Sequence, residues 1–130
     1  MASQVENPNA PNPNGSTPLK IAVQYGNTEI FTFLAPQVEN PNAPGPDGWT
    51  PIHLAARNGH TEIVKFILIV SCSFMESKVD NLNAPTPNYG RTPLQMAMQN
   101  GHKNIARMIA SVVYPNAKKE MFQLINQWKN

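Results

Sequence analysis

The sequence predicts an all-α solenoid, in which short helix-turn-helix units are joined by loops and stacked side by side. A five-residue motif that begins with glycine and contains Thr-Pro occurs three times, at residues 15–19, 48–52 and 90–94. The first two copies lie 33 residues apart and the last two 42 apart, so the second unit carries nine extra residues. A period of this length is typical of repeat proteins, whose units bury their apolar faces against one another.

The same period runs through the rest of each unit. Residues 5–11 recur as residues 38–44, and a glycine turn followed by an isoleucine occurs at 26–30, 59–63 and 101–105. Alignment of the copies places eight of the extra residues within one insertion and one more before the third motif. The result is a single domain, 1–130, with repeats at about 5–37, 38–79 (insertion near Leu68–Lys78) and 80–113.

The first helix of each unit is expected to begin at a threonine and to end at a glycine. The threonine hydroxyl accepts a backbone N–H that lacks a partner, and the proline after it suits the first helical turn. A glycine adopts the left-handed conformation that ends a helix. About eight residues separate the threonine from the glycine, too few for a helix that is stable in isolation. Packing against neighbouring helices must therefore stabilise each first helix. The starts are Thr17, Thr50 and Thr92, and the ends are Gly26, Gly59 and Gly101.

Superposing the copies predicts the core. Apolar residues recur at matching positions of the helices with the spacing of an amphipathic helix, and one alanine per first helix allows close approach. In the first helices these columns are Leu19, Ile52 and Leu94; Ile21, Leu54 and Met96; and Ala22, Ala55 and Ala97. In the second helices they are Ile30, Ile63 and Ile105; Phe33, Phe66 and Met108; and Leu34, Ile67 and Ile109.

The insertion in unit two has two interpretations. Eight residues are close to two turns at 3.6 residues per turn, so the second helix lengthens without rotating its apolar face. Val70 and Phe74 then overhang the shorter neighbouring helices and offer a surface for self-association as a homodimer. Alternatively, the chain from Ser71 onward folds back as a loop that buries Phe74 locally.

The two ends of the repeat array differ. After Asn116, expected to cap a helix, the residues Met121, Leu124, Ile125 and Trp128 share one face, which predicts a terminal capping helix at 116–128. No equivalent polar helix pair precedes the first repeat. We therefore expect the chain to represent a shortened form of a longer array, whose uncapped end is a second candidate for self-association.

These motifs resemble the ankyrin repeat. Unit two matches its signature almost throughout, with Thr50-Pro51-Ile52-His53, then Asn58-Gly59-His60, then Glu62-Ile63-Val64, and Asn42-Ala43 before them. The other units depart from it, since Lys20 and Gln95 stand where the family has histidine. The resemblance implies a stack of helix-turn-helix units that binds a protein partner through a concave face, with His53 bridging neighbouring loops by hydrogen bonds.

Composition argues against the other functional classes. The chain has 130 residues, 41% hydrophobic and 14% charged, with a net charge of +2 and basic residues scattered over different elements, so we expect no nucleic-acid partner. One cysteine and three histidines without ligand spacing predict no metal, no cofactor and no enzymatic activity. The longest apolar run is too short to span a membrane, and with no signal peptide a cytoplasmic or nuclear location is expected.

The resemblance also indicates which residues face a partner, namely the loop tips and the exposed edge of the first helices. Trp49 and Arg91 occupy the same exposed column in neighbouring units, and Trp, Tyr and Arg dominate interface hot spots. The alternative is that Trp49 simply packs over the adjacent loop. The predicted binding residues are Tyr25, Asp47, Trp49, Arg57, Asn58, Tyr89, Arg91 and Gln99, with Asn100 in the same row.

A modification site follows from the resemblance as well. The Asn-Ala step of the ankyrin loop is a type of target for asparaginyl hydroxylation, and Asn42 and Asn83 match this step. The alternative is that both side chains only hydrogen-bond the turn, as asparagine does at such positions.

Overall fold

The computed structural model describes residues 17–38, 41–45, 47–74, 82–87 and 90–128, with the backbone alone for 71–74. These residues form helices and no strand. In chain order, the elements are α1 (Pro18–Gln24), α2 (Thr28–Leu34), the 3₁₀ helix η1 (Ala35–Gln37), α3 (Pro51–Asn58), α4 (Thr61–Phe74), α6 (Pro93–Gln99), α7 (Lys103–Val113), the 3₁₀ helix η2 (Pro115–Ala117) and α8 (Lys118–Gln127).

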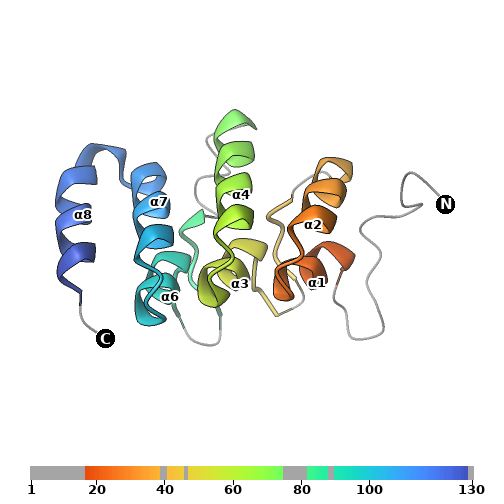
Figure 1. The fold of residues 1–130 in the computed structure, drawn as a ribbon, viewed down its shortest axis with the longest axis horizontal. Coiled ribbons are helices and arrows are strands. Elements are labelled where there is room, and N and C mark those ends of the chain that lie inside the picture. The colour runs from red at the N-terminus through yellow and green to blue at the C-terminus, as the bar shows by residue number, and fades with distance from the viewer. Residues whose placement is uncertain (1–16, 39–40, 46, 75–81, 88–89, 129–130) are drawn as a thin grey trace.

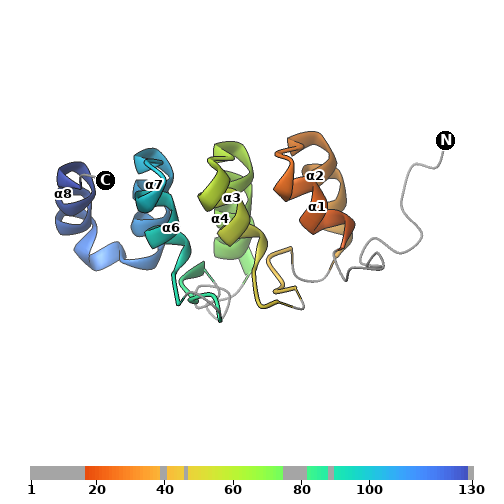
Figure 2. The ribbon, with the colours of Figure 1, turned by 90° about the horizontal axis from the view of Figure 1, so that it is seen from below.

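The helices form two rows, as the sequence predicts for a solenoid. The first helices α1, α3 and α6 pack side by side, and α2, α4, α7 and α8 form the second row (Figure 1). The loops that join the units project from one side of the stack (Figure 2). We call the surface of α1, α3, α6 and these loops the first-helix face. Within the described part of the chain, every helix is too short or too polar to cross a membrane.

The predicted helix starts and ends are confirmed. The hydroxyl oxygens of Thr17, Thr50 and Thr92 accept the N–H groups of the residues three positions on, at 3.1, 3.4 and 3.2 Å. A proline occupies the first turn in all three helices. The terminating glycines have the left-handed backbone that requires glycine, with φ of 70° at Gly26 and 80° at Gly59.

The core follows the predicted columns except at Ile21, which is only half-buried and lies outside the core cluster, and at two residues of α2. Ile30 and Phe33 are each 47% exposed, whereas Phe31 is fully buried. The reason lies in the direction of stacking, because Phe66, the counterpart of Phe33, packs edge-on against Phe31 of the preceding unit, with ring centroids 5.7 Å apart. By equivalence with Phe66, we infer that Phe33 faces the preceding side of α2, where no described helix packs. Two further columns of the second helices are buried although the sequence did not predict them, namely Phe31, Val64 and Ala106, and Ala35, Leu68 and Ala110.

The helix α4 continues into the insertion as far as Phe74, which agrees with the first interpretation and not with a loop that starts at Ser71. It has 14 residues, against 7 in α2 and 11 in α7. Val70 is half-buried and lines a hollow of 140 Å³ with Phe66 and residues of η1 and the following loop. The side chain of Phe74 and the rest of the insertion lie outside the described residues.

The C-terminal helix differs from its prediction in start and orientation. Asn116 lies in η2, and α8 begins at Lys118 without a side-chain cap. Ile125 is fully buried and Phe122 packs against the core, but Leu124 is 59% exposed and Trp128 is 40% exposed. The face that packs against the core is therefore formed by positions 121, 122 and 125.

Candidate protein-binding site

In units one and two, the side chain at the third position of the first helix reaches the loop of the next unit. In unit two this residue is His53, which is fully buried. Its Nδ1 accepts the N–H of Thr50 at 3.1 Å, and its Nε2 lies 2.6 Å from the carbonyl oxygen of Ala84 in the next loop. These partners assign the proton to Nε2, which donates to Ala84. The expected bridging role of His53 is confirmed.

The two departures from the histidine pattern have a structural account. In unit one, Lys20 Nζ reaches the next loop by a different bond, an ion pair of 2.8 Å with Asp47 Oδ1. That carboxylate oxygen also accepts the N–H of Trp49 at 3.1 Å. In unit three, Gln95 Oε1 accepts the N–H of Thr92 at 2.9 Å. Gln95 therefore caps the start of its helix as His53 does, but among the described residues it forms no corresponding bond to a following loop.

These contacts set the charge state of two groups. Burial lowers the pKa of His53 and outweighs the hydrogen bond to Ala84 and the charge of Asp47, which both raise it. Burial alone would raise the pKa of Asp47. The hydrogen bonds from Lys20 and Trp49, with the charge of Lys20, lower it overall. His53 is therefore neutral and Asp47 charged near neutral pH.

We expect acid to destabilise the stack through His53. Its folded-state pKa lies below the ordinary 6.5, so the unfolded chain binds more protons and the free energy of unfolding falls as the pH drops below that value. Urea denaturation between pH 7.5 and 5 measures this slope. His53→Gln, which copies the capping geometry of Gln95, keeps the other histidines, and its profile should be flatter. Equal slopes for both proteins would contradict the assignment.

Trp49 does not stand out as an exposed anchor, which corrects the expectation from the sequence. It is only 8% exposed. Its ring lies 6.0 Å from that of His53, and the guanidinium of Arg57 sits over it at 5.5 Å from the ring centroid. The loop of the next unit packs against the residue before Trp49, since a Cβ at Gly48 would lie 2.3 Å from Pro87. The alternative interpretation, packing over the adjacent loop, describes Trp49 correctly.

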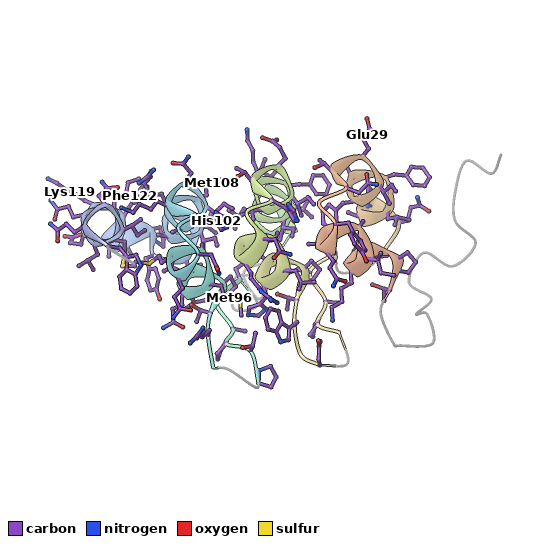
Figure 3. The ribbon with its side chains drawn as sticks, turned by 60° about the horizontal axis from the view of Figure 1, so that its bottom comes forward. Glu29, Met96, His102, Met108, Lys119 and Phe122 are labelled. Carbon is purple, nitrogen blue, oxygen red and sulfur yellow. The ribbon has the colours of Figure 1, made fainter. Side chains whose placement is uncertain are left out.

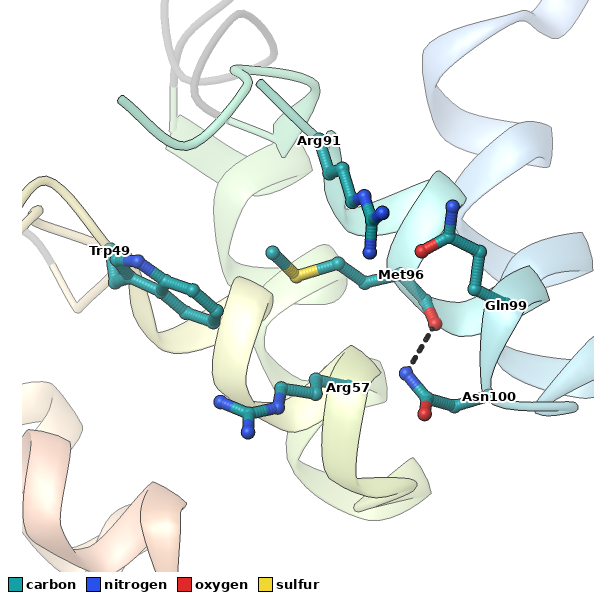
Figure 4. A pocket seen from close by; sticks show the side chains of 6 residues that line it. All are labelled: Trp49, Arg57, Arg91, Met96, Gln99 and Asn100. Atoms are coloured by element: carbon teal, nitrogen blue, oxygen red, sulfur yellow. Dashed lines mark hydrogen bonds between the residues drawn. The ribbon is translucent and has the colours of Figure 1, made fainter. Parts of the chain in front are cut away.

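Trp49 instead forms one wall of a pocket between units two and three. This cavity of 380 Å³, here called the Trp49 pocket, is lined by Trp49, Arg57, Arg91, Met96, Gln99 and Asn100. Met96 comes from α6 on the side from which the loops project, opposite Met108 of α7 (Figure 3). In Figure 4 its thioether runs between the two arginines toward Trp49. Asn100, which also lines the pocket, is held in place by a hydrogen bond from its Nδ2 to the Met96 carbonyl oxygen at 3.0 Å.

The other predicted binding residues are distributed unevenly. Asp47 serves the loop contact described above, with a side chain 52% exposed. Tyr25 is 79% exposed and Asn58 is exposed, but neither lines the Trp49 pocket. Tyr89 lies outside the described residues. Met96 was predicted only as core, and its second role as the floor of the pocket has no signal in a single sequence.

The two loop asparagines form hydrogen bonds that tie their loops to other elements. Asn42 is 3% exposed, and its Oδ1 accepts the N–H of Ile52 at 3.0 Å. Asn83 is half-buried and donates from Nδ2 to the Tyr114 hydroxyl at 3.3 Å. Both bonds reach beyond the local turn, one to the start of α3 and one to the next unit, so they differ from the expected turn hydrogen bonds. Hydroxylation stays a prediction, which mass spectrometry for one added oxygen checks.

The comparison with protein families agrees with the geometry. A family model described as Ankyrin repeats (3 copies) matches residues 2–77 and 40–120. The chain therefore belongs to the ankyrin-repeat family, whose members are generally protein-protein interaction modules. No curated protein matches the chain. In the described part of the chain, no group of three or more His, Cys, Asp or Glu residues could hold a metal ion.

Proposed function

We propose that this ankyrin-repeat protein is a non-enzymatic interaction module that binds a protein partner through its first-helix face, centred on the Trp49 pocket. The observation that carries the proposal is a 380 Å³ hollow at the junction of units two and three, with two arginines in its wall. Both arginines are exposed, although one of them contacts the Trp49 ring. Arginine is enriched at interface hot spots, which favours this surface as a place of contact with a partner.

The test compares substitutions in the pocket with a substitution on the opposite face. Arg91→Ala and Gln99→Ala, both at exposed positions, should weaken binding of a partner captured from a cell lysate, with a loss for Arg91 of about 2 kcal/mol, roughly thirtyfold. The thermal midpoint should change little. Lys65→Ala, on the exposed side of α4, is the matched control. A partner that tolerates both pocket variants but not the control would overturn the proposal.

Self-association is the second candidate function. It is favoured by the seven further residues of α4 relative to α2 and by Ile69, which is 57% exposed on that helix. In this alternative the overhang at Val70 and Phe74 joins two chains in a homodimer. Light scattering of the wild type and of Val70→Ser decides it, since a monomeric wild type excludes the dimer. For both candidate functions, we propose a cytoplasmic or nuclear location of the protein.

A further inference from the structure

We propose that the Trp49 pocket recognises carboxylate side chains on an extended acidic segment of the partner, one carboxylate at Arg57 and one at Arg91. This inference rests on the proposed function and adds the chemistry of the bound segment. It is carried by the charge of the pocket walls, by the positions of the two guanidinium groups and by the apolar floor between them.

The charged residues that line the pocket are all positive. Two of its six lining residues are arginines and none is acidic. Among the residues that the structure describes, neither guanidinium forms an ion pair with a carboxylate. The nearest acidic side chain in the loop, Asp47, is already bonded to Lys20. Glu29 and Glu62 belong to the second helices, so they lie on α2 and α4 rather than on the first-helix face.

The geometry favours carboxylates over other anions. Arg57 is held against the Trp49 ring at 5.5 Å, a contact that restricts its conformations and lowers the cost of ordering it on binding. Figure 4 shows the Met96 side chain between Arg57 and Arg91, so the two forks lie on opposite sides of it. Each fork matches the two oxygens of one carboxylate. A single phosphate would instead be served best by arginines that converge on one point.

The floor and the size of the pocket fit the same ligand. Met96 is 4% exposed and Trp49 8%, so apolar atoms back the two cations and reduce the local screening by water. A volume of 380 Å³ lies near the lower end of the range of about 300–1,000 Å³ for ligand pockets. It admits the side chains of a peptide segment. Gln99 and Asn100 at the rim add amide groups for its backbone.

Peptide selection tests the inference without knowledge of the natural partner. Random twelve-residue peptides displayed on phage are selected on the full chain and, in parallel, on the double variant Arg57→Gln/Arg91→Gln. We expect Asp and Glu to be enriched among peptides from the wild type and not among those from the variant. The double variant Lys65→Gln/Lys119→Gln, at exposed positions outside the pocket, removes the same charge and should retain the enrichment.

Fluorescence polarisation of one selected acidic peptide then measures the individual contacts. We expect at least a roughly tenfold rise in Kd for Arg57→Gln or Arg91→Gln, a smaller rise for the lysine variants that keep the charge, and weaker binding at high salt. Replacing Glu by Gln in the peptide should raise its Kd for the wild-type protein by a similar factor. Circular dichroism checks that the variants remain folded.

Some outcomes would overturn the inference alone, and others would overturn the proposed function as well. A phosphoserine version that binds about tenfold more tightly than the Glu peptide would replace carboxylate by phosphate as the recognised group. Peptides without acidic residues that lose binding on Gln99→Arg would overturn the inference but keep the proposed function. Peptides that ignore every substitution on the first-helix face, or a selection that yields no binder, would overturn both.

Discussion

Replacing Trp49 with alanine is expected to lower the free energy of unfolding by about 3–5 kcal/mol, as much as the core substitution Leu54→Ala at about 2–5 kcal/mol. Trp49 is 8% exposed and Leu54 is 7% exposed, so both truncations leave a cavity in a packed region. The tryptophan also shields His53 and supports Arg57, each of which it contacts through its ring. In a short repeat array, destabilising one unit also destabilises the neighbours that pack against it.

Urea denaturation followed by circular dichroism measures both substitutions under one set of conditions. Tyr25→Ala is the control, because this aromatic residue is 79% exposed and its removal should cost little. A loss for Trp49→Ala close to that of Tyr25→Ala would show that the ring contributes nothing to the fold. If the expected loss is found, Trp49→Ala is unsuitable as a binding variant, and Arg91→Ala is the better probe of the pocket.

Replacing Gly59 with alanine is expected to destabilise the stack by two separate effects. With φ of 80°, a side chain at this position costs about 1–2 kcal/mol in backbone strain. The new methyl group would also lie 2.7 Å from Cε1 of His102 in the next unit, so the ring must move. Overpacking of this kind typically adds about 1–3 kcal/mol.

The chain supplies a matched control for this experiment. Gly90 also has a positive φ, 64°, but a Cβ there would meet no atom of the described residues within 4 Å, so Gly90→Ala is expected to report mainly the backbone effect. Gly59→Ala should therefore cost more than Gly90→Ala, and the difference should shrink when His102 is replaced by alanine as well. Equal losses for the two glycines in denaturation experiments would contradict a packing role for His102. The same contact recurs one unit earlier between Gly26 and His60.

The recurrence of this contact explains a pattern that the sequence alone only records. Glycine ends each first helix, and His60 and His102 occupy equivalent positions just after the glycines of units two and three. The structure places each ring over the glycine of the preceding unit, at Gly26 and at Gly59. The pairing thus acts between units, where glycine provides both the left-handed backbone and the room for the imidazole.

The sequence by itself determined the local architecture of this protein. Helix starts at Thr17, Thr50 and Thr92 depend on one hydroxyl and one proline, and helix ends at Gly26 and Gly59 depend on backbone conformation, so neighbouring residues suffice to predict them. The repeat period likewise predicted most of the core columns, because equivalent positions in stacked units have equivalent neighbours.

Only the tertiary structure decided which side chains of an equivalent column are buried and which are available to a partner. Phe33 and Phe66 share a column, yet Phe33 is exposed because only Phe66 has a described helix on the side it faces. Trp49 is buried beside His53 and Arg57, and the loop of unit three lies against the adjacent Gly48. The Trp49 pocket exists between two units rather than within one, and its shape depends on their spacing, a distance that no single repeat encodes.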